Sequence, residues 1–205
     1  VIKTRGDAVL DVALSRVGGK GLFVKELEQA LLDGDVDLAV HSLKDMPSTL
    51  PSGLTLSATP MREDPRDAWI MRPGAGQGGL ADLAAGAVVG TSSLRRQAQT
   101  LACRPDLKVV PLRGNVDTRL AKLAAQTDGL DAIVLAAAGL NRLGLSEHVT
   151  HTFSVDEMVP AVGQGALAIE GRDDDQRVLG ALDHIHHTPT AMAIEAERAF
   201  MAALD

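Results

Sequence analysis

Cysteine and aromatic residues are scarce in this 205-residue chain. It has one Cys, one Trp, three Phe and no Tyr, so aromatic residues make up 2% of the sequence. Cys103 has no partner in the chain for a disulfide, which is typical of a reducing compartment, and we therefore expect a cytoplasmic protein. With 45% hydrophobic residues, the chain is long enough to bury a substantial core without disulfides.

Long apolar runs are also missing. No segment of the sequence approaches the roughly 18 apolar residues that a membrane span needs, and the first six residues lack the apolar stretch of a signal peptide. We therefore expect neither membrane insertion nor export. Since the chain starts on Val1 instead of Met, we expect its first element to be incomplete.

Positive charge is in deficit too, with 20 Lys and Arg against 27 Asp and Glu and a net charge of −7. Proteins that bind nucleic acids need cations for the phosphates and often aromatic side chains for stacking on bases. The composition therefore argues against a nucleic-acid partner. Any anion has to be bound by local clusters of arginine.

Strand and helix patterns alternate through the middle of the chain. Apolar runs at 87–90, 107–112 and 130–138 predict strands, and helices are expected to follow the first two from about Ser93 and Asn115. This order predicts a parallel sheet, whose ligands gather outside the carboxyl ends of its strands. Earlier, residues 21–32 have the spacing of an amphipathic helix. Residues 37–43 predict a strand that stops at Lys44 and Asp45, because Pro47 follows.

Two segments are expected to cross between domains. Residues 62–67 are charged and contain Pro65, and residues 163–165 contain two glycines. These crossings predict a discontinuous first domain, residues 1–61 and 165–205, and a second domain, residues 62–164, inserted into it. The expected fold class is α/β, with two similar domains, mixed and mainly parallel sheets, and a cleft between the domains. Near the C-terminus two helices are expected, the second capped by Thr188.

Three arginines lie where the electrostatics of a helix disfavour them. Arg95 and Arg96 fall in the first turn of one predicted helix and Arg119 in the first turn of the next. A helix N-terminus favours anions, so arginines there cost stability unless an anion binds beside them. Two such turns behind strands of one sheet indicate an anion site. The alternative is that these arginines are solvated and form only surface ion pairs.

Other polar residues belong to the same predicted edge. Thr91, Ser92 and Ser93 offer hydroxyls and backbone N–H groups, and Arg142 follows the strand at 130–138. Together they predict a ligand with several negative groups. Arginine suits carboxylates and phosphates alike, so these residues leave the chemical class of the ligand open.

Asp45 is the unusual member of this set, because it is a carboxylate among groups that favour anions. An acid in such a place can stabilise a cation or move protons during a reaction. The alternative is a turn residue that hydrogen-bonds the backbone ahead of Pro47. Its spacing alone does not decide between the two.

Five short segments, taken in order, resemble the porphobilinogen deaminase family. They are HSLKDMP at 41–47, REDPRDA at 62–68, GTSSLRR at 90–96, LRGNV at 112–116 and PAVGQGA at 160–166, with GGKGLF at 18–23 ahead of them. The resemblance covers nearly the whole chain. It implies a transferase of porphyrin, haem and chlorophyll biosynthesis, which deaminates four porphobilinogens and joins them into the linear tetrapyrrole hydroxymethylbilane. Porphobilinogen carries acetate and propionate groups, which agrees with a polyanionic ligand.

The resemblance also implies a fold and a cofactor. The family has two hinged domains like those of type II periplasmic binding proteins, and a third domain that carries a dipyrromethane cofactor on a Cys. That Cys is expected beyond Asp205, and a family strand with substrate-binding Arg and Ser is expected before Val1. Cys103 falls late in a predicted helix and is not expected to replace the cofactor Cys. A monomer is expected, and whether this chain alone is active stays open.

Site residues follow from the resemblance position by position. Asp45 is similar to the catalytic carboxylate that stabilises the pyrrole nitrogens and the azafulvene-like intermediate. Lys20 and Phe23 match a mobile active-site loop. The hinges match the two crossing segments. Cofactor and substrate binding is implied for Ser42, Lys44, Thr91, Ser92, Ser93, Arg95, Arg96, Arg113, Arg119 and Arg142.

Two further patterns and one rival function complete the expectations. The glycines of residues 74–79 have dinucleotide-binding spacing, but Pro73 precedes them and Gln99 stands where an acidic ribose contact is needed, so a surface loop is expected. The histidines of residues 184–187 have no further ligands at suitable spacing, and no metal is expected. The rival function is a non-catalytic hinged protein that binds a small organic polyanion, which would have no use for Asp45.

Overall fold

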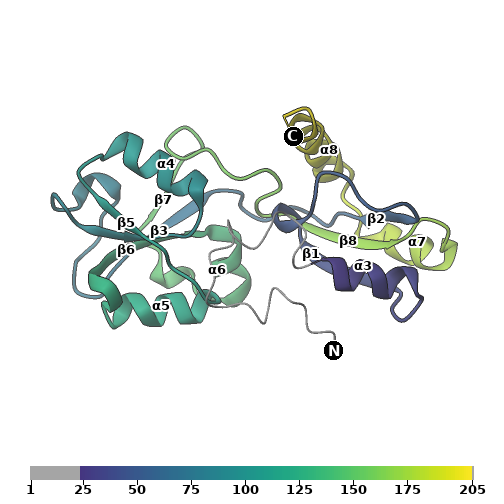
Figure 1. Ribbon diagram of the computed structural model, residues 1–205, viewed down its shortest axis with the longest axis horizontal. Helices are drawn as coiled ribbons and strands as arrows, with labels where there is room; N and C mark the ends of the chain where they lie inside the picture. Colours follow the sequence, from purple (N-terminus) through teal and green to yellow (C-terminus); the bar gives the residue numbers. More distant parts are fainter. Residues whose placement is uncertain (1–23, 205) are drawn as a thin grey trace. The chain divides into compact units, whose positions relative to one another are not determined.

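The computed structural model describes residues 24–204, and their contacts divide them into two compact units (Figure 1). The first unit holds the described residues up to Glu63 and from Val162 onward, and the second is Asp64–Ala161. Lys20 and Phe23, the residues of the predicted loop, lie outside the described residues.

A three-stranded sheet with the order β1-β8-β2 forms the centre of the first unit. The central strand β8 is antiparallel to both neighbours. The strands are β1 (Leu38–Ser42), β2 (Leu54–Ala58) and β8 (Leu167–Arg172). The helices are α3 (Lys25–Leu32), α7 (Gln176–Leu182) and α8 (Thr188–Ala202), with 3₁₀ turns η1 (Leu43–Asp45) and η5 (Asp183–Ile185).

Each helix of the first unit packs on the sheet through its own small apolar cluster. The central residues of these clusters are Leu31 of α3 with Ala39, Val178 and Leu182 of α7 with Ile169, and Ile194 of α8 with Ala168. Burial of such side chains contributes about 25 cal/mol for each Å² of apolar surface removed from water. The short β1 is therefore held between β8 and α3.

The second unit contains a five-stranded mixed sheet with the order β5-β4-β6-β3-β7. Strands β5, β4 and β6 are parallel, whereas β3 is antiparallel to both β6 and β7. The strands are β3 (Asp67–Met71), β4 (Val88–Gly90), β5 (Lys108–Val110), β6 (Leu130–Ala136) and β7 (His151–Thr152). The helices are α4 (Leu94–Cys103), α5 (Val116–Ala124) and α6 (Ala137–Leu143), with 3₁₀ turns η2 (Leu80–Asp82), η3 (Thr127–Gly129) and η4 (Ser146–His148).

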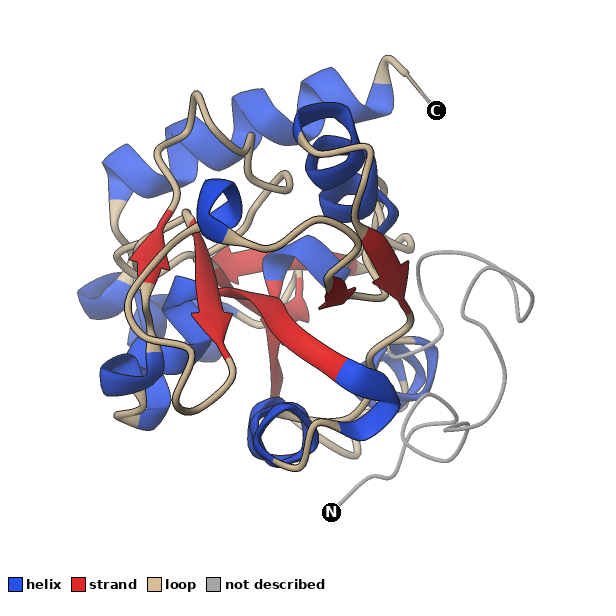
Figure 2. Cartoon of the chain, turned by 90° about the vertical axis from the view of Figure 1, so that its left-hand side faces the viewer, coloured by secondary structure: helices blue, strands red, loops and turns tan. Residues whose placement is uncertain are grey.

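Strand β6 supplies side chains to two cores, one on each face of this sheet. Ile133 and its neighbours pack with residues of α5 and α6, while Val134 belongs to a second cluster around Trp69. The Trp69 ring is fully buried and meets Phe153 edge-on at 5.9 Å. Helices α5 and α6 therefore pack on the face of the sheet that carries Ile133. Figure 2 distinguishes the helices and strands of the chain by colour.

The predicted α/β class with mixed sheets is confirmed, and so is the parallel arrangement of β4, β5 and β6. The sheets are not mainly parallel among the described residues, because four of the six strand pairings are antiparallel. Parallel neighbours need a crossover connection that returns the chain to the same end of the sheet. Strands β3 and β8 each follow a crossing segment and have no such crossover from a neighbouring strand. Strand β3 is antiparallel to β6, and β8 is antiparallel to β1 and β2.

Two boundaries differ from the expected ones for local reasons. The last two residues of the expected strand at 130–138 already belong to α6. Helix α8 is capped by His187 and not by Thr188, because the His187 imidazole accepts a hydrogen bond from the backbone N–H of Thr190.

Gly90, the last residue of β4, lies where the core leaves no room for a side chain. An added Cβ would be 2.8 Å from Leu130 Cδ2, 3.0 Å from Leu112 Cδ2 and 3.1 Å from Ile133 Cγ2. The loop that carries Thr91 therefore starts from a point closely packed on the core.

Gly90→Ala should lower the free energy of unfolding by about 1–3 kcal/mol, because overpacking forces core side chains from their preferred rotamers. Gly180→Ala in α7 is the matched control, since nothing lies within 4 Å of its added Cβ. Alanine favours a helix over glycine by up to about 1 kcal/mol. Urea denaturation measures both variants, and equal stabilities would contradict the packing argument.

A buried polar cluster lies within the first unit. His41 Nε2 and Glu170 Oε2 are 2.9 Å apart on neighbouring strands, and both residues are buried. Burial of Glu28 in α3, and next the charge of Glu170, raise the pKa of the Glu28 carboxyl above its ordinary value, while His41 and Lys25 oppose the shift. Ionised Glu28 is therefore unfavourable in the folded protein.

Glu28→Gln should increase stability at neutral pH. The pKa of Glu28 is higher in the folded than in the unfolded protein, so its contribution to stability is complete below the unfolded value and declines as pH rises through the folded value. The gain from glutamine should therefore be largest above the folded pKa, shrink as pH falls through it, and be lost at about 4.3, the ordinary pKa of glutamate. Urea denaturation across this range tests the trend, with the exposed Glu195→Gln as control. A gain that grows in acid would contradict it.

Candidate functional site

Three parallel strands of the second unit end at one edge of its sheet, and each leads into a helix. Strand β4 ends at Gly90 before α4, β5 at Val110 before α5, and β6 at Ala136 before α6. The structure therefore brings to one edge the segments that begin the arginine-bearing helices. The predicted residues that follow these strands are Arg95 and Arg96 in α4, Arg113 ahead of α5, Arg119 in α5 and Arg142 in α6.

The hydroxyl residues after β4 bind the backbone and join neighbouring loops. Ser92 Oγ donates to the carbonyl of Leu112 at 2.9 Å, and Thr91 Oγ1 accepts from the N–H of Ser93 at 3.1 Å. Ser93 caps α4 by accepting from the N–H of Arg96. These side chains therefore fix the start of α4 against the loop after β5.

Arg95 and Arg96 share a carboxylate that neither predicted alternative included. Arg95 Nη1 lies 2.7 Å from Asp67 Oδ2, and Arg96 Nη2 lies 2.7 Å from Asp67 Oδ1. Asp67 is fully buried and Arg96 is 6% exposed. The pair is therefore neither a solvated surface feature nor an anion site without an internal counterion.

The charges around Arg96 show which guanidinium groups gather here. Burial lowers the pKa of Arg96, and Asp67 acts in the opposite direction. The positive charges of Arg95 and Arg119 lower the pKa of Arg96 further, so all three groups lie near one another. Arg119 Nε also donates to the carbonyl of Gly114 at 2.7 Å, which holds its side chain against the loop before α5.

Arg113 lies in the loop before α5, and Arg142 lies in the last turn of α6. Arg113 is half-buried, and its carbonyl accepts from Lys122 Nζ at 3.1 Å. Arg142 is exposed in the last turn of the short α6, where a cation is favoured by the helix dipole. The helix α6 therefore separates Arg142 from the end of β6, whereas the sequence predicts that Arg142 follows the strand directly.

The candidate residues of the first unit lie at the end of β1. Ser42 ends the strand, Lys44 and Asp45 belong to the turn η1, and all three are exposed. Buried Leu43 anchors this turn against Gly163, where an added Cβ would be 2.7 Å from Leu43 Cδ2. Gly163 also has a φ of +71°, which favours glycine. The glycine-containing segment therefore supports the turn that presents Asp45.

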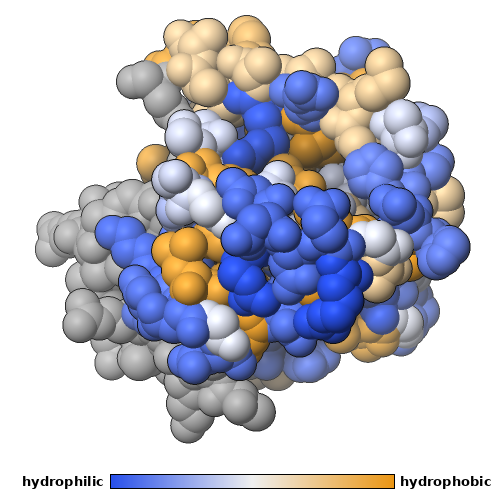
Figure 3. Space-filling view, turned by 90° about the vertical axis from the view of Figure 1, so that its right-hand side faces the viewer, coloured by the Kyte–Doolittle hydropathy of each residue, from blue (hydrophilic) through white to orange (hydrophobic). Residues whose placement is uncertain are grey.

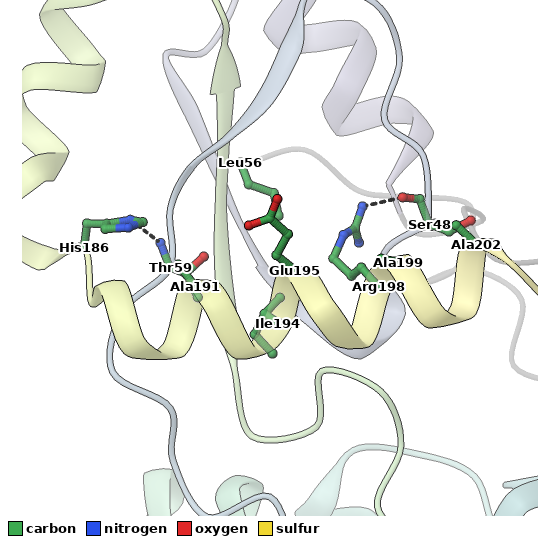
Figure 4. A pocket seen from close by; sticks show the side chains of 10 residues that line it. All are labelled: Ser48, Leu56, Thr59, His186, Ala191, Ile194, Glu195, Arg198, Ala199 and Ala202. Carbon is green, nitrogen blue, oxygen red and sulfur yellow. Dashed lines mark hydrogen bonds between the residues drawn. The ribbon is translucent and has the colours of Figure 1, made fainter.

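A separate cavity of about 420 Å³ is lined by residues of α8, by His186 and by residues between Ser48 and Thr59 (Figure 4). Its lining includes Ile194, Glu195 and Arg198, and Arg198 Nη2 donates to the carbonyl of Ser48 at 2.8 Å. None of the predicted site residues lines it. In Figure 3, moderately hydrophobic residues lie along the top of the molecule, where α8 is. Phe200 of α8 is 64% exposed.

Comparisons with known proteins identify the family. The model described as "Porphobilinogen deaminase, dipyromethane cofactor binding domain" matches residues 1–180. The chain belongs to the porphobilinogen deaminase family. It is 55% identical to the porphobilinogen deaminase of Syntrophotalea carbinolica and 57% identical to that of Exiguobacterium sibiricum, with the whole chain covered in both. The chain spans 63% and 65% of the length of these two relatives.

Solved structures with a similar fold are much more distant. A periplasmic binding protein of Salmonella typhimurium shares 17% identity at a TM-score of 0.41, with 87% of this chain and 71% of that chain covered. The BvgS periplasmic VFT2 domain of Bordetella pertussis shares 19% identity at a TM-score of 0.44, with 84% and 72% covered.

The family match raises the question of whether the side chains at this edge suit a dipyrromethane cofactor. The matched domain is the one that binds this cofactor, and pyrrole carboxylates suit arginine side chains. Arg95 Nε is buried and has no hydrogen-bond partner among residues 24–204, so the hydrogen-bonding capacity of Arg95 is incomplete. Arg95 is therefore a side chain with hydrogen-bonding capacity for a pyrrole carboxylate. Cys103 is exposed at the end of α4.

Two other expectations concern metals and membranes. Within residues 24–204, no group of three His, Cys, Asp or Glu is placed to hold a metal ion. His186 accepts from the N–H of Thr59 and His187 caps α8. In the same part of the chain, no helix has the length and apolar character needed to cross a membrane.

Two acidic residues make contacts that the sequence does not predict. Asp67 is expected only as part of a crossing segment, but its carboxylate binds two arginines. Glu197 of α8 accepts from Arg62 Nη2 at 3.2 Å and from the N–H of Gly163 at 2.7 Å. Both acids contact residues far away in the sequence, so spacing gives no signal. An acidic residue directly ahead of the apolar run 68–71 was the one available hint for Asp67.

Arg96→Met should lower the free energy of unfolding by roughly 3 kcal/mol, because removing one partner of a buried ion pair leaves the other charge poorly compensated. Arg142→Met, at the exposed end of α6, should change it by at most about 0.5 kcal/mol. Urea denaturation of the two variants measures the contrast. Similar values for both would show that the Asp67 contact adds nothing to stability.

Proposed function

We propose that the protein is a hydroxymethylbilane synthase, a transferase that deaminates porphobilinogen and joins four of these pyrroles head to tail. The family membership supports this role, and the relatives that carry the name porphobilinogen deaminase match the chain over its whole length. Porphobilinogen and its polypyrrole products are therefore the proposed partners. The dipyrromethane cofactor, when bound, supplies the ring to which the first pyrrole is joined.

The observation that carries the proposal is the arginine-rich edge of the second unit. Arg95 and Arg96 each contact the Asp67 carboxylate at 2.7 Å, and the charges of Arg95 and Arg119 both act on Arg96. Each pyrrole of the product carries two carboxylates, and a guanidinium group binds a carboxylate through two parallel hydrogen bonds. We assign binding of these carboxylates to Arg95, Arg96, Arg113, Arg119 and Arg142, with Thr91, Ser92 and Ser93 shaping the loop beside them.

Asp45 is the proposed catalytic carboxylate. In each addition the carbon–nitrogen bond of the aminomethyl group of the incoming porphobilinogen breaks and ammonia leaves. The methylene carbon then bonds to the α-carbon of the last pyrrole of the growing chain, and that pyrrole loses its α-proton. Positive charge develops on the pyrrole nitrogens as ammonia leaves, and a carboxylate beside them stabilises it. Asp45 is exposed in the turn after β1 with Ser42 and Lys44, so a ligand can reach all three.

Several finer features belong to the same proposal. The two units would act as hinged domains, with residues 62–67 and 163–165 as hinges, and Lys20 and Phe23 would belong to the active-site loop. The protein would act in the cytoplasm, as the single cysteine suggests. It would act as a monomer, as the family resemblance implies. Light scattering on the full-length protein tests the monomer.

Asp45→Asn in the full-length protein should reduce ammonia release from porphobilinogen by at least about 100-fold, because the charge that stabilises the developing cation is lost. Binding of porphobilinogen should change little, since the arginines are intact. Ammonia release and the absorbance of the oxidised product measure turnover. Asp156→Ala, an exposed acid in the other unit, is the control and should keep full turnover.

Two outcomes would contradict this assignment in different ways. Unchanged turnover in Asp45→Asn would remove Asp45 from the mechanism. A full-length parent protein that binds porphobilinogen and releases no ammonia would favour the rival function, a binding protein for a small organic polyanion.

A further inference from the structure

Asp67 lies at the arginine edge because of the direction of its strand. Strand β3 is antiparallel to β6, and Asp67, its first residue, pairs with Ala136, the last residue of β6. The carboxylate therefore reaches the same edge as the residues that follow β4. Its backbone is fixed as well, since the carbonyl of Asp67 accepts from the N–H of Phe153 at 3.0 Å.

The two arginines use Asp67 differently. Arg96 donates through Nε to Asp67 Oδ1 at 2.9 Å and through Nη1 to the carbonyl of Val134 at 3.1 Å, and its Nη2 also faces Asp67. All three of its nitrogens therefore have protein partners. Arg95 contacts Asp67 and the carbonyl of Val159 through Nη1 alone, and its side chain is 23% exposed.

From this geometry we infer that Asp67 is a positioning residue, which holds the Arg95 guanidinium group beside the buried Arg96 in the orientation that receives a carboxylate of the pyrrole ligand. The inference rests on the proposed function. Adjacent guanidinium groups repel one another, and on flexible side chains they would separate without a shared counterion. One carboxylate between two arginines leaves the trio with a net positive charge, so it aligns the groups and still favours an anion.

Positioning and simple charge make opposite predictions for Asp67→Asn. Removing a negative charge makes the edge more positive, which by itself would tighten the binding of an anionic ligand. Loss of orientation weakens binding, because the two parallel hydrogen bonds between a guanidinium group and a carboxylate form only in a defined geometry. The direction of the change in KM therefore separates the two roles.

The experiment uses the full-length holoenzyme with porphobilinogen as the probe. For Asp67→Asn we expect KM to rise about 10-fold or more, with a smaller fall in kcat. Asp67→Glu keeps the charge and should recover part of the loss. A lowered KM would show a charge effect only, and an unchanged KM with a lower melting temperature would show a structural role only. Either result would overturn the inference.

Asp131→Asn is the matched control. Asp131 also pairs with an arginine of the second unit, Arg72, at 3.3 Å, and its carboxylate accepts from the N–H of Val88. It lies near the start of β6, whereas Asp67 faces the end of that strand. Its loss should reduce stability and leave KM unchanged. An equal rise of KM in both variants would overturn the role of Asp67.

Two further results keep the inference distinct from the function on which it rests. If Asp67→Asn does not fold, as judged by circular dichroism, Asp67→Glu decides, and an unchanged KM in that variant overturns the inference. An active parent enzyme with unchanged KM in the variants rejects only the role of Asp67. A parent that releases no ammonia rejects the proposed function and the inference together.

Discussion

The buried carboxylate of Asp67 is the contact on which the arrangement of Arg95 and Arg96 at the edge of the second unit depends. Helix α4 buries two of its residues, Arg96 and Thr100, so its inner face is polar. A buried guanidinium is costly unless a carboxylate and further acceptors surround it. Asp67 and the carbonyl of Val134 provide these acceptors for Arg96. The start of α4 is therefore set by hydrogen-bond geometry, which is more directional than apolar packing.

Strand direction explains how a single acid reaches this place. The parallel strands β4, β5 and β6 deliver their carboxyl ends, and the residues that follow, to one edge. Strand β3 runs the other way and delivers its first residue to that edge. A mixed sheet can thus place an acid from a strand's start among basic residues from strand ends. An all-parallel sheet would have placed Asp67 at the opposite edge.

The first unit presents its candidate residues by a different physical means. The turn with Lys44 and Asp45 is held by the buried Leu43, which packs against Gly163. Glu197 of α8 binds both Arg62 and the N–H of Gly163. The two segments that leave this unit are therefore tied to the same helix. An exposed acid on an anchored turn can meet a ligand without moving the backbone that carries it.

The sequence by itself determined the α/β class, the parallel β4-β5-β6 core of the second unit and the residues that surround its edge. These follow from local signals, because apolar periodicity, glycines and caps such as Ser93 act within a few residues. The tertiary structure alone decided the antiparallel entry of β3 and β8 and the pairing of Asp67 with Arg95 and Arg96. The Asp67 contacts join residues 28 and 29 positions apart and the strand pairings join residues still further apart, so only the folded sheet brings them together. Whether an arginine meets solvent, a ligand or a buried acid depends on that pairing, which no local pattern records.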